Sequence, residues 1–246
     1  MNKSIIIIYF LLATISSLAQ NKITYKAALL ENYFSDDMIK KSSSSKIKSF
    51  YKQMNIGIEK HIDDFEFILK YDKEESFFTM EEQLEIETNK MHKAAYIAVK
   101  GKDKFYMNVI TNQKLKQTVA FGEKFLIQSN INSLQWERHK ETKKIQNYLC
   151  NKATTIKKVV NSKGTFEKLV VAWYTLQIPI GQGPRGYGGL PGLILELQED
   201  KIIYSASKIG LNKKSKKGIR KPSKGKLVTE KEYEAIVLGL DWNYGG

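Results

Sequence analysis

The sequence predicts a mainly β protein with a single antiparallel curved sheet, half-barrel or sandwich-like, and a few helices including a C-terminal one. Three observations predict this fold class. Short segments rich in aromatic and β-branched residues recur along the chain, apolar and polar residues alternate within them, and turn residues separate them. No repeat of fixed period is present. Whether the sheet closes into a barrel, splits into a sandwich or curls around a groove stays open at this stage.

The N-terminus has the composition of a secretory signal peptide. Lys3 precedes an apolar run that ends at Thr14, and small residues follow at the positions that a signal peptidase reads. We expect cleavage before Gln20, so that residues 1–19 are removed and residues 20–246 form one β-rich domain. The apolar run is short for a membrane anchor. The sequence therefore predicts a periplasmic or secreted protein.

The first half of the chain is expected to form several strands and one helical or loose connection. Residues 36–51 are polar and rich in serine and lysine, and their apolar residues follow no clear period, so this stretch is assigned to the connection. Residues 100–103 and Gly122 provide hairpin signals. The predicted strands cover residues 21–30, 65–71, 76–82, 96–99, 104–110, 115–121 and 125–128.

The second half continues in β-forming residues and ends in a helix. Tyr148 and Cys150 are expected to share one face of a strand that begins at residue 144, with Leu149 on the other face. Thr229 and Glu232 form a capping box that predicts a helix over residues 229–239. The predicted strands cover residues 144–153 with their continuation 154–160, and residues 167–175, 193–197 and 201–208.

The chemically reactive residue types form no pattern typical of an active site. Cys150 is the one cysteine, and we expect it to be a small buried side chain, with a reactive thiol or an intermolecular disulfide as the alternatives. His61, His92 and His139 are scattered, with no two at the spacing of metal ligands. No G-x-S-x-G elbow occurs. The sequence therefore predicts a protein that is not an enzyme and has neither a metal site nor a cofactor.

An excess of positive charge is the clearest surface feature that the sequence predicts. The formal net charge is +14 at pH 7, and no acidic residue lies between Lys201 and Lys226. Glycine, serine and proline are expected to keep a Lys-rich loop at about 210–228 from ordering alone. The loop is either merely solvated or contacts an anionic membrane surface, a lipid or an acidic protein; the lack of interleaved aromatics argues against nucleic acid. The candidate contact residues are Lys213, Lys214, Lys216, Lys217, Arg220 and Lys221.

A loop crowded with glycine and proline precedes an apolar segment. Residues 181–192 read GQGPRGYGGLPG. Glycine adopts positive φ without strain and lets other backbone come close. A phosphate-binding loop would need another glycine pattern and a following helix, so we expect these glycines to serve architecture, with Tyr187 and Leu190 pinning the loop onto the core.

The same loop resembles the signature of a known family. Residues 189–194 read GLPGLI, the hexapeptide that names the GLPGLI family of exported bacterial proteins, and further motif pieces occur in order over residues 134–205. One departure is that Lys163 and Lys168 stand where the family often has an arginine. The resemblance implies a β-rich envelope protein, and some members look like periplasmic half-barrels that carry lipid. The residues assigned to the structural motif are Cys150, Trp173, Tyr174, Pro179, Gly183, Pro184, Gly189, Leu190, Pro191 and Gly192.

Two functions are expected from these features. The first is an exported, non-catalytic binding protein of the cell envelope, whose ligand in a groove of the sheet is an acyl chain, a lipid or another envelope protein. The alternative is a scaffold that docks on a protein partner or on lipopolysaccharide through the Lys-rich segment.

Overall fold

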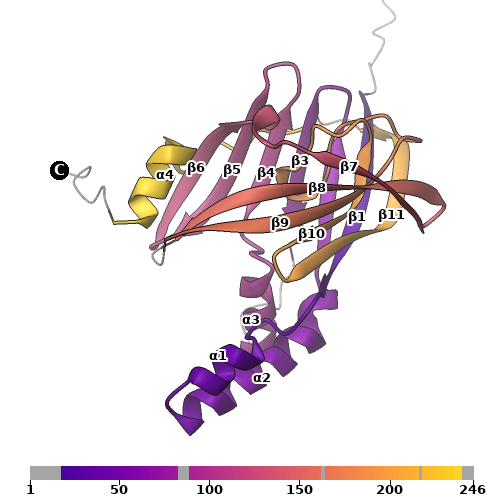
Figure 1. The fold of residues 1–246 in the computed structure, drawn as a ribbon. Coiled ribbons are helices and arrows are strands. Elements are labelled where there is room, and N and C mark those ends of the chain that lie inside the picture. Colours follow the sequence, from indigo (N-terminus) through magenta and orange to yellow (C-terminus); the bar gives the residue numbers. More distant parts are fainter. Residues whose placement is uncertain (1–17, 83–88, 162–163, 216–217, 240–246) are drawn as a thin grey trace, which may run out of the picture.

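One large, open and curved sheet forms the body of the protein in the computed structural model, which describes residues 18–82, 89–161, 164–215 and 218–239 (Figure 1). The order of its twelve strands is β12-β6-β5-β4-β3-β2-β1-β11-β10-β9-β8-β7. The pair β12 and β6 is parallel, and the other paired strands are antiparallel. The predicted fold class is thus confirmed, with an open sheet in place of a closed barrel.

The strands differ widely in length, and the longest lie in the second half of the chain. Their bounds are β1 (Leu18–Leu29), β2 (Glu66–Tyr71), β3 (Glu75–Met80), β4 (Lys104–Asn108), β5 (Gln113–Ala120), β6 (Glu123–Asn130), β7 (Glu137–Ile145), β8 (Tyr148–Asn161), β9 (Gly164–Thr175), β10 (Leu193–Glu199), β11 (Ile202–Ser215) and β12 (Lys226–Thr229). The helices are α1 (Asp36–Lys41), α2 (Ser45–His61), α3 (Lys90–Ala98) and α4 (Glu230–Val237), and the 3₁₀ turns are η1 (Ile62–Asp64), η2 (Ile131–Ser133) and η3 (Pro184–Gly186).

Strand β1 joins the two arms of the sheet. It pairs with β2 on one side and with β11 on the other. The first arm, β2 to β6, is a meander of neighbouring hairpins, and the second, β11 back to β7, is another. In Figure 1 the second arm curves in front of the first, and α1, α2 and α3 project below the sheet. A curved sheet of this kind has a concave interior between its arms.

Two predicted strands differ from the structure. Residues 96–99, predicted as a strand, belong to α3 and its C-terminal cap. Asn89 accepts hydrogen bonds from the backbone N–H groups of Met91 and His92 and begins that helix. Four residues are too few to distinguish a period of two from one of 3.6.

The second difference is a hairpin inside the segment predicted as one strand from residue 144. Strand β7 ends at Ile145 and β8 begins at Tyr148, and Gln146 turns the chain at φ 53°. Positive φ is unusual for glutamine. A turn at this position is usually indicated by glycine or asparagine, and residue 146 is neither. Cys150 lies on the buried face and Leu149 on the exposed face, as the alternation predicted.

The main hydrophobic core lies against one face of the sheet and includes residues of α2 and α3. Phe67, Phe78 and Tyr204 pack there ring against ring, and Cys150 belongs to the same cluster. Tyr174 belongs to a second cluster, whereas its neighbour Trp173 packs against the first. These adjacent aromatics therefore face opposite sides of the strand, as the alternation of side chains along a strand requires.

The Lys-rich segment is partly built into the sheet. Strand β11 continues to Ser215, well past Gly210. Its end pairs with Gln20 and also with Leu18 and Ala19, which lie before the expected cleavage site. Ile219 packs on a small cluster formed by Tyr106, Leu115 and Leu126. The segment thus orders by adding to existing structure. Within the described residues, we find no helix with the length and apolar character needed to cross a membrane.

Candidate functional site

A partly open cavity of about 550 Å³ lies between the two arms of the sheet. Strands β4 to β6 form one wall, β8 to β11 form the other, and α4 contributes a third side. Volumes of 300–1,000 Å³ are typical of small-molecule sites. The curvature of the sheet therefore creates a space of the size of a ligand.

Basic side chains dominate the charged lining of this cavity. They come from both arms, so the charge converges from segments that are distant in sequence. The acidic lining residues are fewer, and they are Glu199, Asp200, Glu230 and Glu234. The basic lining residues are Lys100, Lys114, Lys116, Lys157, Lys158, Lys168, Arg185 and Lys201.

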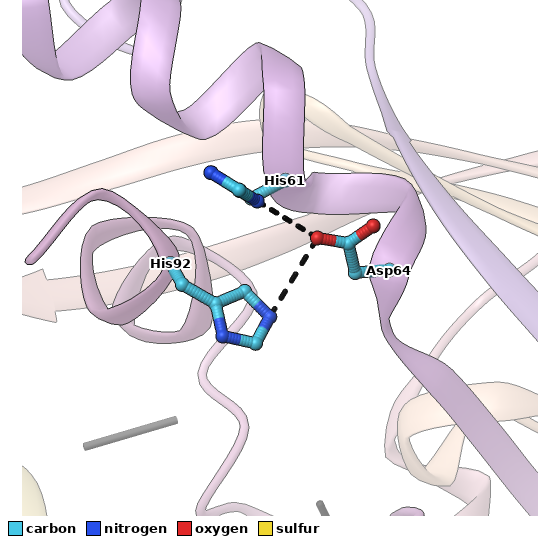
Figure 2. Close-up of side chains that lie close together, drawn as sticks. All are labelled: His61, Asp64 and His92. Carbon is cyan, nitrogen blue, oxygen red and sulfur yellow. Dashed lines mark hydrogen bonds and ion pairs between the residues drawn. The ribbon is translucent and has the colours of Figure 1, made fainter. Parts of the chain in front are cut away.

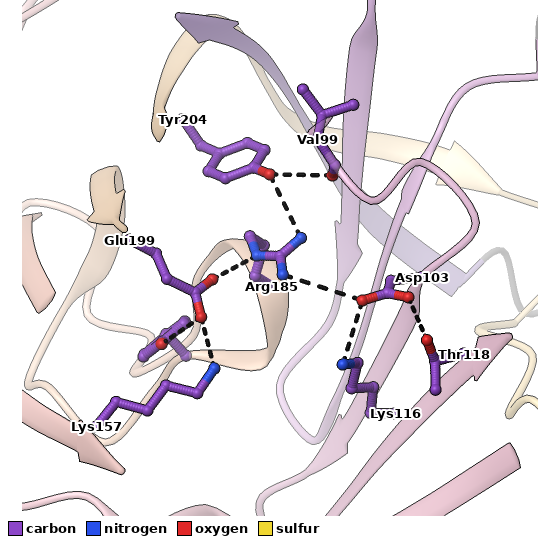
Figure 3. Close-up of polar contacts among 9 residues, drawn as sticks. Val99, Asp103, Lys116, Thr118, Lys157, Arg185, Glu199 and Tyr204 are labelled. Carbon is purple, nitrogen blue, oxygen red and sulfur yellow. Dashed lines mark hydrogen bonds and ion pairs between the residues drawn. The ribbon is translucent and has the colours of Figure 1, made fainter. Parts of the chain in front are cut away.

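A buried charge cluster forms the floor of the cavity, and Arg185 is its centre (Figure 3). The Arg185 Nε donates to Glu199 Oε2 at 2.5 Å, and its Nη1 donates to the Tyr204 hydroxyl at 3.3 Å. The Tyr204 hydroxyl in turn donates to the Val99 carbonyl oxygen at 3.2 Å. The side chain of Arg185 is 6% exposed. A charge buried this deeply is stable only when it is paired and hydrogen-bonded.

Glu199 accepts from three side chains at once, one on β8 and two in the glycine loop. Besides Arg185, the Lys157 Nζ lies 2.5 Å and the Tyr187 hydroxyl 2.9 Å from its Oε1. Burial alone would raise the pKa of the Glu199 carboxyl, but the neighbouring guanidinium and lysines outweigh it and hold that pKa well below its usual range. Glu199 is therefore ionised at neutral pH and fixes the cations around it.

Asp103 provides the second carboxylate of the floor. It accepts from the Thr118 hydroxyl at 2.6 Å, and its Oδ2 lies 3.3 Å from the Lys116 Nζ and 4.0 Å from the Arg185 Nη2. Figure 3 shows Arg185 between this carboxylate and that of Glu199. The two acids hold the guanidinium in place from opposite sides.

The glycine loop positions Arg185. Residue 185 itself has φ 55°, and its side chain extends from η3 into the space between the arms. The indole Nε1 of Trp136 donates to the Gly188 carbonyl oxygen at 2.9 Å, and Tyr187 is 1% exposed. The loop contacts β3, β4 and β5, so it fills one end of the concave interior.

The glycines of this loop permit close backbone contacts, as the sequence predicted. A Cβ on Gly192 would lie 2.0 Å from the Thr175 carbonyl oxygen, and one on Gly181 would lie 2.6 Å from the Leu190 carbonyl oxygen. Gly189 has φ 85° and open space around it, so it serves the turn. The loop nevertheless delivers a charged side chain to the cavity, which the architectural interpretation did not include.

Two lysines of the lining have surroundings that destabilise their protonated, positively charged form. Desolvation, with the Lys157 charge next in importance, lowers the pKa of Lys114 to about 8. Lys100 is exposed as a residue, yet desolvation at its place in the cavity, together with Arg185 and Lys116, lowers its pKa to about 8. Among the described residues, neither lysine has a carboxylate within ion-pair distance. Both ammonium groups would gain from a bound anion.

Apolar and aromatic side chains complete the lining. The Phe105 ring lies under the Arg185 guanidinium at 5.1 Å, and Ile127 and Tyr204 face the same space. Tyr233 and Val237 of α4 close the third side. The capping box between Thr229 and Glu232 is present and fixes the start of α4, as predicted. The cavity can therefore contact both an anionic group and an apolar body.

The structure describes the side chains of only two candidate contact residues of the Lys-rich segment. Lys213 and Lys214 pair through their backbone with β1, and their side chains and Lys216 and Lys217 lie outside the described residues. Arg220 and Lys221 are exposed, and the Lys221 Nζ donates to Gln113 Oε1 at 2.6 Å. Of the two whose side chains are described, neither Arg220 nor Lys221 is a lining residue of the cavity.

Apart from Pro179, the structural-motif residues belong to the hydrophobic clusters and the glycine loop, and none of the motif residues lines the cavity. Cys150 is fully buried with a free thiol, and desolvation raises its pKa to about 11. His139 bonds the Thr154 hydroxyl at 2.7 Å. Leu190 is buried, as expected. Of the remaining motif residues, Gly183, Pro184 and Gly192 are buried, and Pro179, Gly189 and Pro191 are exposed.

Sequence reasoning missed the residues that carry the cavity. Arg185, Glu199 and Lys157 lie on three different elements, and no linear spacing brings them together. One signal was available for Arg185. It is the single charged residue within the loop of residues 181–192, and a charge among so many glycines would have justified a functional hypothesis.

Comparisons with known proteins support the fold and match one family model to a short stretch of the chain. A model of a family described as a protein of unknown function (Porph_ging) matches residues 161–196. That stretch contains the glycine loop and Arg185. No curated protein matches the sequence.

Two solved structures of PNGF-II, one in space group C2 and one in P21, are similar in fold. Their TM-scores are 0.51 and 0.50, and each is 16% identical to this chain. The match covers 89% of this chain and 33% of the PNGF-II chain, so the chain spans about a third of the length of that protein. At this identity the similarity establishes the fold alone.

Proposed function

We propose that this protein binds a small organic anion in the cavity between the two arms of its sheet. The observation that supports the proposal most directly is the convergence of cationic side chains from both arms on one partly open space. Glu199 and Asp103 neutralise the floor, but Lys100 and Lys114 keep unneutralised charge. A bound anion supplies the partner that these two lysines lack.

The lining also indicates which kind of anion fits. Phe105, Ile127 and Tyr233 offer apolar surface beside the lysines. An amphiphilic anion with a carboxylate or phosphate head and an apolar body matches both parts. The acyl ligand expected from the sequence is retained in this narrower form, with its head group held by charge.

A binding role agrees better with the cavity than a catalytic one. Cys150, the one thiol, is buried and its pKa is raised, which leaves a poor nucleophile. His139 contacts a threonine, and the cavity floor holds its acids in ion pairs. We further propose that the protein is exported and belongs to the GLPGLI family, on the strength of the N-terminal segment and of the hexapeptide at residues 189–194.

The scaffold alternative rests on the charge of the Lys-rich segment alone. Arg220 and Lys221 are exposed and could contact an acidic surface. The segment nevertheless packs against the sheet through Ile219, so part of it is occupied within the chain. The cavity is the better candidate because its charges converge.

Calorimetric titration with decanoate, glucose 6-phosphate and inorganic phosphate tests the proposal. We expect decanoate to bind one to one and to bind more weakly when Lys114 is replaced by methionine. The matched control is Lys52→Met, which removes the same charge from an exposed position on α2. Preference for glucose 6-phosphate would retain the anion site and reject the acyl ligand. The proposal would be contradicted if none of the three compounds bound. It would also be contradicted if their affinities were the same in Lys114→Met and in Lys52→Met.

A further inference from the structure

His61, Asp64 and His92 meet between the end of α2 and the first turn of α3, and none of the three lines the cavity (Figure 2). The His61 Nδ1 lies 2.8 Å from Asp64 Oδ2, and the His92 Nε2 lies 3.7 Å from the same oxygen. The three ligand atoms all lie within 4.8 Å of one another. The two histidines, which the sequence gives no reason to connect, are thus neighbours in space.

The surrounding structure positions the His92 ring and brings the two helices together. His92 stacks on Phe65 at 4.8 Å between ring centroids and 10° between planes. Gly57 allows α2 and α3 to approach closely, since a Cβ there would lie 2.5 Å from the Met91 sulfur. A metal site needs ligands that the fold holds in place before the ion arrives.

One buried atom of this group lacks the partner that its chemistry requires. The His92 Nε2 is buried and has no hydrogen-bond partner, since the Asp64 oxygen at 3.7 Å is beyond hydrogen-bonding distance. The His92 side chain is 12% exposed, whereas that of Asp64 is 51% exposed. Figure 2 shows the Asp64 oxygen lying between the two rings. Solvent therefore reaches the carboxylate, and an ion could enter from that side.

We propose that His61, Asp64 and His92 bind a divalent transition-metal ion, with zinc as the first candidate. Zinc takes imidazole nitrogens and carboxylate oxygens at about 2.0–2.2 Å, so two tetrahedral ligand atoms lie about 3.3 Å apart. The distances of 2.8 Å and 3.7 Å lie on either side of that value. Three protein ligands leave a fourth position for water, and two imidazoles with one carboxylate suit zinc better than calcium or magnesium.

The ion would join α3 to the end of α2. Its ligands come from α2, η1 and α3, and it would therefore cross-link the helical part that projects from the sheet. The same three residues without an ion form a hydrogen-bonded and ionic cluster, which is the competing explanation. The two explanations differ in whether zinc binds with defined stoichiometry.

Zinc titration of the tag-free full chain, followed by calorimetry and by the visible absorption of added Co²⁺, tests the proposal. We expect one ion per chain, and an affinity more than about tenfold lower in His92→Gln and in Asp64→Asn. Asp64→Asn should keep the fold because this side chain is half exposed. His139→Gln, which removes a histidine from β7, is the control and should bind zinc as the native chain does.

A second readout separates a metal site from a cluster that only supports the fold. Zinc should raise the thermal unfolding temperature of the native chain and of His139→Gln, and should raise that of His92→Gln by clearly less. Stoichiometry well below one, or equal zinc affinity in the native chain and His92→Gln, would overturn the proposal. The proposal would also be overturned if His139→Gln lost as much zinc affinity as His92→Gln.

Discussion

Lys114 provides a test in which stability and binding should change in opposite directions. Its ammonium group lies 5.6 Å from the centre of the Tyr187 ring and close enough to the Lys157 charge to be repelled by it. Lys114→Met keeps the length of the side chain and removes the charge. We expect the variant to be more stable than the native chain at pH 7 and to bind anions more weakly.

The pKa gives the size of the effect. A pKa lowered from 10.5 to about 8 corresponds to a ceiling of roughly 3 kcal/mol, at about 1.4 kcal/mol per pH unit. The cavity is partly open, so solvent screening reduces the gain to about 1 kcal/mol. The native lysine is charged in both states below pH 8 and neutral in both above its unfolded pKa. The gain should therefore be full below pH 8 and vanish as the pH approaches 10.5.

Urea unfolding at pH 7 and at pH 10 measures this change. With a slope of about 2–3 kcal/mol per molar urea, the midpoint should rise by about 0.4 M at pH 7 and by less at pH 10. Lys52→Met, from an exposed helix position, should shift the midpoint little at either pH. The reasoning is that the surroundings destabilise the charged form of Lys114. A Lys114→Met variant that is less stable than the native chain at pH 7 and has unchanged anion affinity would refute it.

Three further predictions follow from the site. Decanoate affinity should fall as the pH is raised from 7 to 9, because Lys114 loses its proton near pH 8; a flat calorimetric profile would count against a role for its charge. Gly192→Ala should cost about 3 kcal/mol in urea unfolding because its Cβ would meet a carbonyl oxygen at 2.0 Å, whereas Gly189→Ala should cost about 1 kcal/mol for its positive φ; the reverse order would exclude close packing as the reason for Gly192. Arg185→Leu should cost about 3 kcal/mol by leaving Glu199 with too little compensation, and Arg185→Leu combined with Glu199→Leu should recover part of that loss; a double variant no more stable than the single one would argue against coupling.

The sequence predicted the sheet because its signals are local. Alternation of apolar and polar residues placed most of the strands within a few residues, and the capping box placed α4. The prediction of a strand at residues 96–99 was wrong because a short apolar stretch suits either a strand or a helix. The Asn89 cap and the packing of α3 against α2 favour the helix. The hairpin at Gln146 was missed because a residue without a turn preference adopts positive φ there.

The site could not be predicted because it depends on the curvature of the sheet. Lys114 lies on β5 and Lys157 on β8, and each alone reads as an ordinary exposed lysine of a strand. They become neighbours only when the second arm folds over the first. The same is true of His61 and His92, which the packing of α2 on α3 brings together.

The glycine loop shows how one segment serves two purposes. Gly181 and Gly192 let the chain pass backbone atoms that any side chain would meet. This close packing places the Arg185 side chain in contact with Glu199. The guanidinium is then the centre of the charge cluster at the cavity floor. The close packing of the glycines and the placement of the arginine are therefore parts of one arrangement.

The most direct test is to locate a bound ligand. Crystals of the protein grown with 2-bromodecanoate would reveal the bromine, which lies beside the carboxylate, by its anomalous scattering. We predict a bromine position inside the cavity between the arms, with the carboxylate in contact with the Lys114 Nζ. Bromine found only along the Lys-rich segment of residues 210–228, or nowhere in the crystal, would contradict the account.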